Sequence, residues 1–255
     1  MIVSLSLKTK QLFFRGVIIQ FFKPEALEFL NQIKKNNNKE WFSKNRHRYE
    51  ELILEPSKRF VREFGEELLA LDPHINAIDK VNGSLFRIYR DVRLSKDKTP
   101  LKSRIGIIFW RGSNKRLQSA SFYLHFSPEE FLVASGIRGF SKDMLLGYRE
   151  YIKDEKNARS LNNIMQDLLS KGFLFPDPKY KRYPRGFSSS DKYSNLYLYA
   201  NMYAYKRLNP KEICSKRLNQ ILFEIYSDLL PMYEWIYELS MNVVIDGNQK
   251  SLSLS

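Results

Sequence analysis

The densest cluster of side chains that could do chemistry lies in residues 86–104, the run FRIYRDVRLSKDKTPLKSR. Two of its residues, Asp91 and Asp97, are acidic, and seven are basic. Like charges at this density repel one another unless bound anions or paired carboxylates offset them. The segment therefore predicts either an anion site or a network of ion pairs, and it does not specify a reaction. The basic residues are Arg87, Arg90, Arg93, Lys96, Lys98, Lys102 and Arg104.

Arg90 is the basic residue whose expected position most clearly requires an anionic partner. If residues 86–93 are extended, their side chains alternate between two faces, and Arg90 shares the more apolar face with Phe86 and Ile88. A guanidinium there needs a carboxylate or a bound anion to offset its desolvation, and its planar fork can bind either through two hydrogen bonds. For Arg90 and Asp91, an anion site and a purely structural role are equally good interpretations; in the second, Asp91 and Asp97 neutralise neighbouring arginines and attach the sheet to a helix.

A second patch, residues 179–187, interleaves lysines and arginines with aromatic residues and lacks helical periodicity. Such a composition can follow a nucleic-acid backbone while its rings stack on bases. A surface loop with tyrosines lying on the domain is the simpler interpretation, and we favour it. If the protein instead binds nucleic acid, the expected contacts beyond the anion-site residues are Lys96, Lys181, Arg182 and Arg185.

The composition describes a basic globular protein. Hydrophobic residues make up 43% of the chain and the formal charge is +14, a field that attracts anionic partners, although scattered lysines are often only a solvated surface. Cys214 is the only cysteine, so no intrachain disulfide can form, and a reducing, cytoplasmic location is the simplest setting. No apolar run approaches the ~20 residues that span a bilayer. We therefore expect a soluble protein with no membrane partner.

Common catalytic and cofactor motifs are missing from the sequence. The three histidines, His47, His74 and His125, are far apart and share no metal-ligand spacing. There is neither a glycine-rich phosphate loop nor a Gly-x-Ser-x-Gly nucleophile motif. We expect no metal and no cofactor, and if the protein is an enzyme, Asp91 or Asp97 is the candidate acid or base.

The elements that must position these residues change in type along the chain. Helical periodicity runs from Pro24 to the break at residues 36–38. A second helix carries residues 41–52 and should stop before Pro56, which begins a third helix ending near Asp72. Helical patterns return at residues 141–151 and 161–169 and after Pro210.

Four short segments between the two helical regions have the composition of strands, rich in aromatic and β-branched residues. Short polar turns separate them, which favours antiparallel pairing because parallel pairing requires a long crossover. The strands are expected at residues 85–89, 105–110, 120–126 and 131–136. We predict an α+β fold in which this antiparallel meander is packed by N-terminal and C-terminal helices. One domain over residues 22–240 is expected, with an N-terminal extension (1–21) and a polar tail (241–255).

Four motifs together resemble a family of conserved hypothetical proteins from bacteria and fungi, domain of unknown function 2461. The likeness covers about residues 22–240 and implies a shared fold and an emphasis on the Arg/Asp/Lys motif, but no activity. Leu94 and Leu101 depart from the family pattern, which tends to have Phe and Tyr there. The motifs are residues 24–30 with Glu40, Trp41, Phe42, Asn45, Arg46 and Tyr49; residues 87–102; Tyr123-Leu-His125; and residues 181–186.

The functional prediction is a pocket for a phosphate- or carboxylate-bearing ligand, formed where the basic motif meets the second helix. Nucleic-acid binding and a purely structural ion-pair network are the alternatives, and the oligomeric state is not predicted. The expected ligand-binding residues are Arg87, Arg90, Asp91, Arg93, Lys98 and Lys102, together with Trp41, Asn45 and Arg46.

Overall fold

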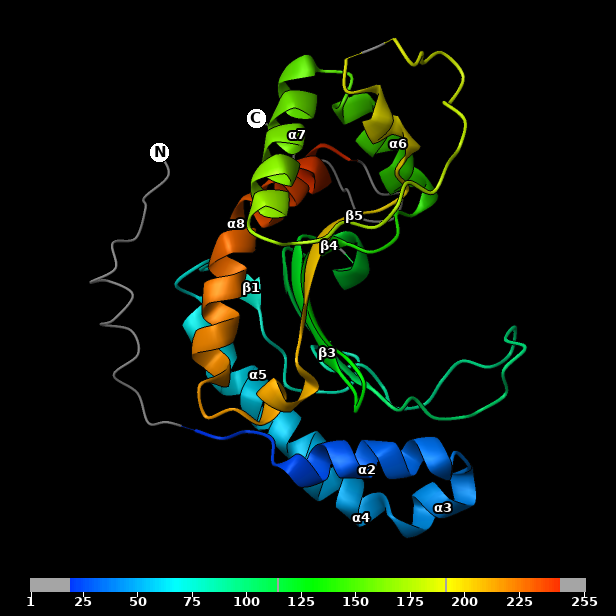
Figure 1. Ribbon diagram of the computed structural model, residues 1–255, viewed down its shortest axis with the longest axis vertical. Helices are drawn as coiled ribbons and strands as arrows, with labels where there is room; N and C mark the ends of the chain where they lie inside the picture. The colour runs from blue at the N-terminus through cyan, green and yellow to red at the C-terminus, as the bar shows by residue number, and fades with distance from the viewer. Residues whose placement is uncertain (1–18, 114, 191, 244–255) are drawn as a thin grey trace, which may run out of the picture.

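A five-stranded antiparallel sheet lies at the centre of the chain, and its strands follow one another in sequence order (Figure 1). The computed structural model describes residues 19–113, 115–190 and 192–243. Each strand pairs with the next, as expected for strands joined by short connections. The strands are β1 (Ile75–Asn76), β2 (Ile105–Arg111), β3 (Ser121–Phe126), β4 (Phe131–Ile137) and β5 (Met202–Leu208). The predicted α+β fold with a central antiparallel meander is confirmed.

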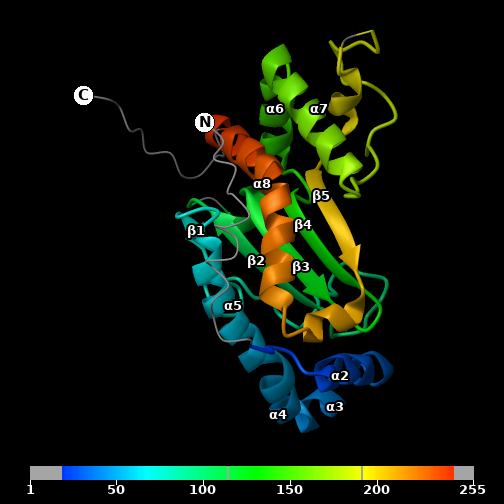
Figure 2. The ribbon, with the colours of Figure 1, turned by 60° about the vertical axis from the view of Figure 1, so that its left-hand side comes forward.

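Helices cover one face of the sheet and both of its ends. The long helix α8 (Leu218–Asn242) lies across the strands, beside α5 (Glu55–Leu68) (Figure 2). Helices α2 (Pro24–Lys35), α3 (Lys39–Lys44) and α4 (Arg46–Tyr49) lie at one end of the sheet, and α6 (Lys142–Tyr151) and α7 (Glu155–Ser170) lie at the other. Short 3-10 turns fill the connections at Arg116–Gln118, Ser194–Leu198 and Pro210–Cys214.

The core forms between α8 and alternate residues of the strands. Phe122 stacks on Tyr226 and Tyr233 of α8, with ring centroids 4.6 and 4.3 Å apart. Because side chains alternate along a strand, the neighbours of Phe122 in β3 face away from α8. This second face carries no covering helix in Figures 1 and 2, and we call it the open face.

Two local predictions were wrong. Residues 85–89, expected as one of four strands, form only isolated bridges, among them Leu85 to Ile107 and Tyr89 to Leu101, and the sheet is completed by β1 and β5, which were not predicted. The expected break before Pro56 is also absent, because a π-helical segment (Glu50–Leu54) joins α4 directly to α5. A widened turn accommodates a residue that lacks a backbone N–H, so the proline does not end the helix.

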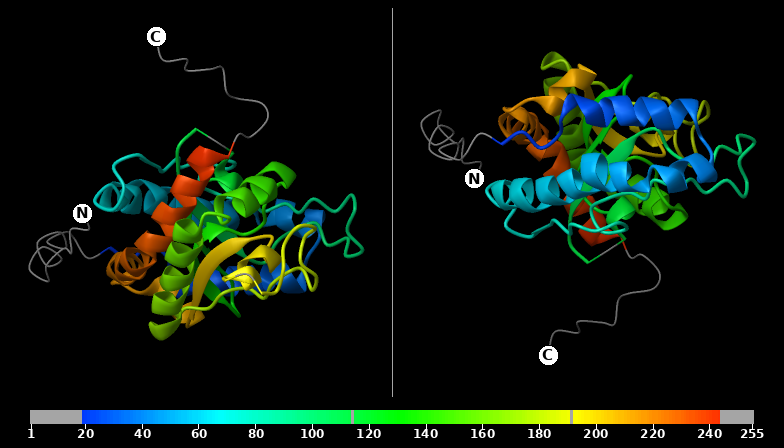
Figure 3. Two further views of the ribbon diagram at one scale, coloured as in Figure 1. Left: turned by 90° about the horizontal axis from the view of Figure 1, so that it is seen from above. Right: turned by 90° about the horizontal axis from the view of Figure 1, so that it is seen from below.

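Residues 86–104, which connect β1 to β2, form an irregular hairpin that we call the arm. Its two sides are joined by the Arg90 N–H donating to the Pro100 carbonyl and the Lys102 N–H donating to the Ile88 carbonyl, both at 2.8 Å. The arm extends beyond the rest of the molecule in both views of Figure 3. It projects on the side of the open face (Figure 1).

The chain ends contribute little to the description. Of the predicted extension, residues 1–18 lie outside the described residues, and Phe21 and Phe22 are buried in the core. Of the predicted tail, residues 244–255 lie outside them as well, and residues 241 and 242 belong to the end of α8. No helix in the described part of the chain is long and apolar enough to cross a membrane.

Candidate functional site

Both carboxylates of the arm pair with arginines of the arm itself. The Arg90 guanidinium binds the carboxylate of Asp97 and the hydroxyl of Thr99. Arg93 donates twice to Asp91, from Nε at 2.9 Å and from Nη2 at 2.6 Å. Arg90 thus pairs with Asp97, and Asp91 pairs with Arg93, which the expected alternation placed on the same face as Asp91.

The remaining polar groups of the arm are braced by its backbone. The Lys98 ammonium donates to the Val92 carbonyl and the Lys102 ammonium to the Arg87 carbonyl, both at 2.9 Å. Hydrogen bonds from the Thr99 N–H and from Arg90 lower the pKa of Asp97 to about 2, and its pairing with Arg93 lowers the pKa of Asp91 strongly. Groups held so firmly as anions are poor proton carriers near neutral pH.

The second-helix residues form a separate cluster. Trp41 stacks on Phe29, the Asn45 amide donates to the Trp41 carbonyl at 2.9 Å, and Arg46 pairs with Glu50 at 2.9 Å. None of the three makes a hydrogen bond or ion pair with the arm's charged side chains in the described structure. The arm's base, and not its charges, reaches this region.

Two contacts attach the base of the arm to the helical layer. The side chain of Asn37 donates to the Leu101 carbonyl at 3.0 Å and accepts from the Leu101 N–H at 2.9 Å. The ring of Tyr89 meets Phe42 edge-on, with centroids 5.6 Å apart. The asparagine-rich break after α2 therefore fixes the arm in place.

A cavity of about 770 Å³ lies on the open face of the sheet, and we call it the sheet-face cavity. Of the arm, it takes only Phe86, Lys102 and Arg104. Residues of all the longer strands complete it. Those that carry charge or rings are Tyr123, His125, Glu130, Arg138, Tyr203, Tyr205 and Arg207.

Small residues form the floor of the sheet-face cavity. Gly106, Ala134 and Gly136 come from β2 and β4, between longer side chains on the neighbouring strands. A side chain at Gly106 would place its Cβ 2.9 Å from the Tyr123 hydroxyl, so that tyrosine lies over β2. The hollow follows from these short side chains and not from a gap between elements.

Basic groups outnumber acids around the cavity. Its lining holds four cationic side chains and one carboxylate, Glu130. Arg207 pairs with Glu130 at 3.0 Å, whereas Arg104 and Arg138 have no ion pair with any carboxylate of the described residues. Burial and the charges of Arg87, Arg104 and Arg116 lower the pKa of Lys102, the fourth cation. Two of the cavity's arginines therefore carry positive charge that no carboxylate of the described residues compensates.

His125 and Glu130 form a polar pair at the end of β3. The His125 Nε2 lies 2.8 Å from Glu130 Oε2, and Arg207 binds the other carboxylate oxygen. Burial lowers the pKa of His125, Glu130 opposes this, and Arg104 and Arg138 add to it. The imidazole is thus a neutral group near pH 7, held in one orientation beside two arginines.

Arginines of the cavity also influence the pKa values of two neighbouring tyrosines. Burial raises the pKa of Tyr123, and the charges of Arg104 and Arg138 oppose that rise. Burial likewise raises the pKa of Tyr203, against Arg138 and Arg207. Arg138 is thus close enough to influence Tyr123, His125 and Tyr203, although these come from different strands or strand ends.

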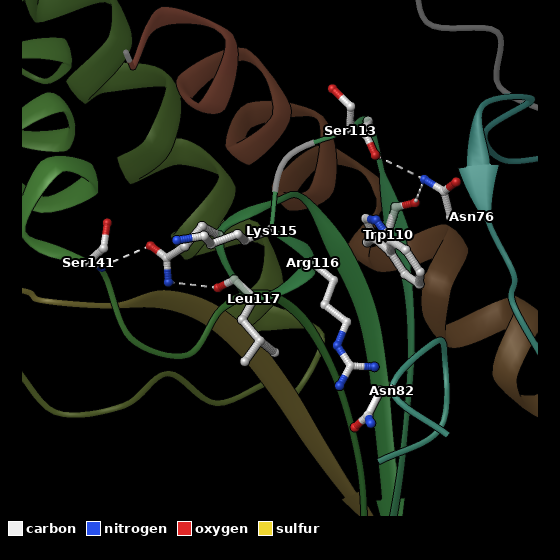
Figure 4. A pocket seen from close by; sticks show the side chains of 10 residues that line it. Asn76, Asn82, Trp110, Ser113, Lys115, Arg116, Leu117 and Ser141 are labelled. Carbon is white, nitrogen blue, oxygen red and sulfur yellow. Dashed lines mark hydrogen bonds between the residues drawn. The ribbon is translucent and has the colours of Figure 1, made fainter. Parts of the chain in front are cut away.

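A second hollow of about 790 Å³ lies nearby, beside the turn after β2 (Figure 4). Its amides are engaged by backbone: Asn76 donates to the carbonyls of Trp110 and Gly112, and Gln118 accepts from the Ser141 N–H. Arg116 lies over the Phe86 ring, 4.6 Å from its centroid. This hollow lacks a carboxylate or an imidazole and is the weaker candidate.

The residues expected for nucleic-acid binding are exposed. Lys96 lies near the arm's tip, and Lys181, Arg182 and Arg185 lie in the loop that follows α7. The arm and this loop lie toward opposite ends of the open face (Figure 1).

Sequence reasoning identified Lys102 but missed most of the sheet-face cavity. Tyr123 and His125 entered only through the family resemblance, and Arg138 and Arg207 lay in segments with no distinctive composition. The alternation in β3, with Phe122 and Leu124 apolar and Tyr123 and His125 polar, was the available signal, because it indicates a polar face on an otherwise buried strand.

Comparison with known proteins gives a family and no close relative. A family model described as "conserved hypothetical protein (DUF2461)" matches residues 25–235. No curated protein and no solved structure matches the chain.

Proposed function

The chain belongs to the DUF2461 family of conserved hypothetical proteins, and we propose that it binds a small phosphate- or carboxylate-bearing ligand in the sheet-face cavity. The observation that carries this proposal is the pair Arg104 and Arg138, two guanidiniums that line a concave polar site without a carboxylate partner among the described residues. Guanidinium groups recognise carboxylate and phosphate oxygens through paired hydrogen bonds.

The electrostatics of the cavity favour an anion over a neutral ligand. Lys102, Arg104 and Arg138 share a lining in which Glu130 is already paired with Arg207. Arg104 and Arg138 are exposed and Lys102 is half-buried, and a bound anion would offset the repulsion among cations that line one cavity. A ligand with one or two negative charges would therefore gain affinity from each of the three groups.

The arm acts in this proposal mainly as a support. Its internal ion pairs hold the hairpin, which places Lys102 and Arg104 at the edge of the cavity. The other predicted ligand residues of the arm, Arg87, Arg90, Asp91, Arg93 and Lys98, then contribute through its shape and not through contact with the ligand. We also propose a cytoplasmic location, because a protein with a single cysteine suits a reducing compartment.

Calorimetric titration with ribose 5-phosphate tests the proposal. We expect the double substitution Arg104→Gln, Arg138→Gln to weaken binding at least tenfold, since a hydrogen bond to a charged group contributes about 1.5–3 kcal/mol. The matched control Arg93→Gln removes one positive charge from the exposed arm and should leave affinity within about twofold. Equal losses in the two variants would contradict the proposal, as would no loss in the double variant.

Nucleic-acid binding is the second candidate, favoured by one observation. The arm and residues 179–187 project on the side of the open face (Figure 1), where the lining residues place the cavity. Phosphate contacts made by several lysines and arginines give an affinity that falls steeply with salt. Submicromolar, salt-sensitive binding of a labelled oligonucleotide, lost on alanine substitution of Arg93, Lys96 and Lys98, would favour this candidate.

A further inference from the structure

Two tyrosines flank a single alanine on the open face of the sheet. In the strand register, Tyr123 of β3 pairs with Ala134 of β4, and Ala134 pairs in turn with Tyr205 of β5. Neighbouring strands lie about 4.8 Å apart, so the two tyrosine backbones are about 10 Å from one another. The side chain of Ala134, between them, is only a methyl group.

The two tyrosine rings leave this position from opposite sides. Tyr123 leans over Gly106 of β2 and meets the ring of Phe86 edge-on, with centroids 5.9 Å apart. Tyr205 packs along its own strand, 5.7 Å from the ring of Tyr203 and 5.0 Å from the guanidinium carbon of Arg207. Ala134 therefore forms the bottom of a slot with an aromatic group on either side.

A flat ring is the ligand shape that suits a slot with an aromatic group on either side. A planar ring that contacts a tyrosine on each side needs about 7–8 Å, twice the optimal separation of carbon atoms. Two backbones about 10 Å apart can provide that space. An aliphatic chain would also fit, but it would gain nothing from the quadrupoles of the flanking rings.

Cationic groups lie at the rim of the same slot. Arg104 and Arg138 influence both Tyr123 and His125 electrostatically, and Arg138 and Arg207 influence Tyr203. A ring over Ala134 would therefore have guanidiniums within reach of an attached anion. The volume of about 770 Å³ is in the range of cavities that hold one small ligand.

We propose that the ligand is a mononucleotide whose base inserts over Ala134 between Tyr123 and the Tyr203–Tyr205 pair while its phosphate binds Arg104 and Arg138. The inference rests on the proposed function and adds the chemical class of the ligand. A free phosphate or a short carboxylate would use the arginines alone. A nucleotide uses both the arginines and the slot.

Affinities for AMP and ribose 5-phosphate, measured by calorimetry, separate the two levels of the proposal. Stacking on one aromatic side chain changes affinity about tenfold, so AMP should bind at least about tenfold more tightly than ribose 5-phosphate. Tyr205→Leu should reduce that preference to about threefold or less while leaving the affinity for ribose 5-phosphate within about twofold.

Two control variants keep the test interpretable. Tyr205→Phe retains the ring and should retain the preference for AMP, which also shows that position 205 can be changed without unfolding the protein. Tyr183→Leu alters a tyrosine outside the cavity, in the 179–187 loop, and should change neither affinity.

Each contrary result overturns a different statement. Equal binding of AMP and ribose 5-phosphate by the unaltered protein would overturn the nucleotide assignment and leave the anion site standing. No binding of either compound would overturn the proposed function itself. Binding of a twelve-residue oligoadenylate more than a hundredfold tighter than AMP would overturn the mononucleotide in favour of a single-stranded nucleic acid.

Discussion

The arm and the sheet-face cavity are both basic, but their arginines differ in whether they bind a carboxylate. On the arm, Arg90 and Arg93 each bind a carboxylate within the same hairpin. In the cavity, Arg104 and Arg138 lie among tyrosines and an imidazole with no carboxylate bound to them in the described structure. The arm is the more conspicuous in the sequence and the cavity is the better candidate site.

Charge density alone does not locate a binding site. An exposed ion pair contributes only about 0–1 kcal/mol, so the pairs that Arg90 and Arg93 make add little to the stability of the fold. A cation that lines a cavity without a partner keeps its capacity to bind an anion. Whether a basic side chain has a carboxylate partner, which depends on the geometry of the nearby turns, decides whether it supports the fold or can bind an anion.

The largest expected effect concerns the floor of the cavity. Gly136 has φ of +124°, and an added Cβ would lie 2.3 Å from the Met202 carbonyl oxygen and 2.7 Å from the Tyr203 Cα. Backbone strain and a clash with backbone together should make Gly136→Ala cost about 3 kcal/mol or more in the free energy of unfolding, measured in urea.

Two control substitutions test whether the loss of stability is specific to Gly136. Gly139, in the same cavity, has nothing within 4 Å of an added Cβ, and the fully exposed Leu94 lies near the arm's tip. Gly139→Ala and Leu94→Ala should each change stability by less than about 0.5 kcal/mol. A loss at Leu94 as large as that at Gly136 would break the distinction between a rigid cavity and a peripheral arm.

An intermediate effect is expected where the arm is attached. Asn37→Ala leaves both backbone groups of Leu101, a residue only 1% exposed, without their partners. We expect a loss of about 1–3 kcal/mol in urea unfolding. Asn36→Ala is the matched control, because Asn36 is exposed and donates only to the Gln32 carbonyl within its own helix. Equal losses in the two variants would mean that the arm is held by other contacts.

The smallest effect on stability is expected within the arm itself. Asp97→Asn removes the charge that binds Arg90, and the hairpin should open more often while the fold persists. Tryptic cleavage within residues 90–98 should then become several-fold faster with no measurable change in global unfolding. Asp167→Asn, on α7, should leave the rate of cleavage in the arm unchanged. A large loss of global stability in Asp97→Asn would show that the arm is part of the core.

The fold was largely predictable because its pattern is local. Alternation and short turns identified β2, β3 and β4, and helical periodicity identified most helices. β5 was missed because it pairs with β4 across more than sixty residues and its own segment carries Lys206 and Arg207. Residues 85–89 have the composition of a strand but form only isolated bridges. The next residue, Arg90, binds Asp97 across the hairpin.

The site was less predictable because it depends on which charges meet. Lys102 was expected in the site and lines the cavity. Asp97 comes within reach of Arg90 only through the turn between them, which composition does not describe. Arg104, Arg138 and Arg207 belong to three different strands or strand ends, and only the completed sheet brings them around one hollow.

The three histidines of the chain lie in three different regions of the molecule and can serve as probes of them. His125 lies in the sheet-face cavity, exposed His47 lies on α4 close to the predicted Trp41–Arg46 cluster, and His74 lies near β1. The pKa of His125 is lowered by burial and by Arg104 and Arg138, against the influence of Glu130. An anion beside those arginines would offset their charge and raise this pKa, so the affinity for a carboxylate, whose charge is constant in this range, should increase as the pH falls below 7.

The most direct test is an NMR titration of these histidines with and without saturating ribose 5-phosphate. The account predicts that the pKa of His125 begins below its usual value and rises when the ligand binds, while the resonances of His47 and His74 do not respond. A ligand response at His47 with none at His125 would place the anion beside the arm and contradict the central claim.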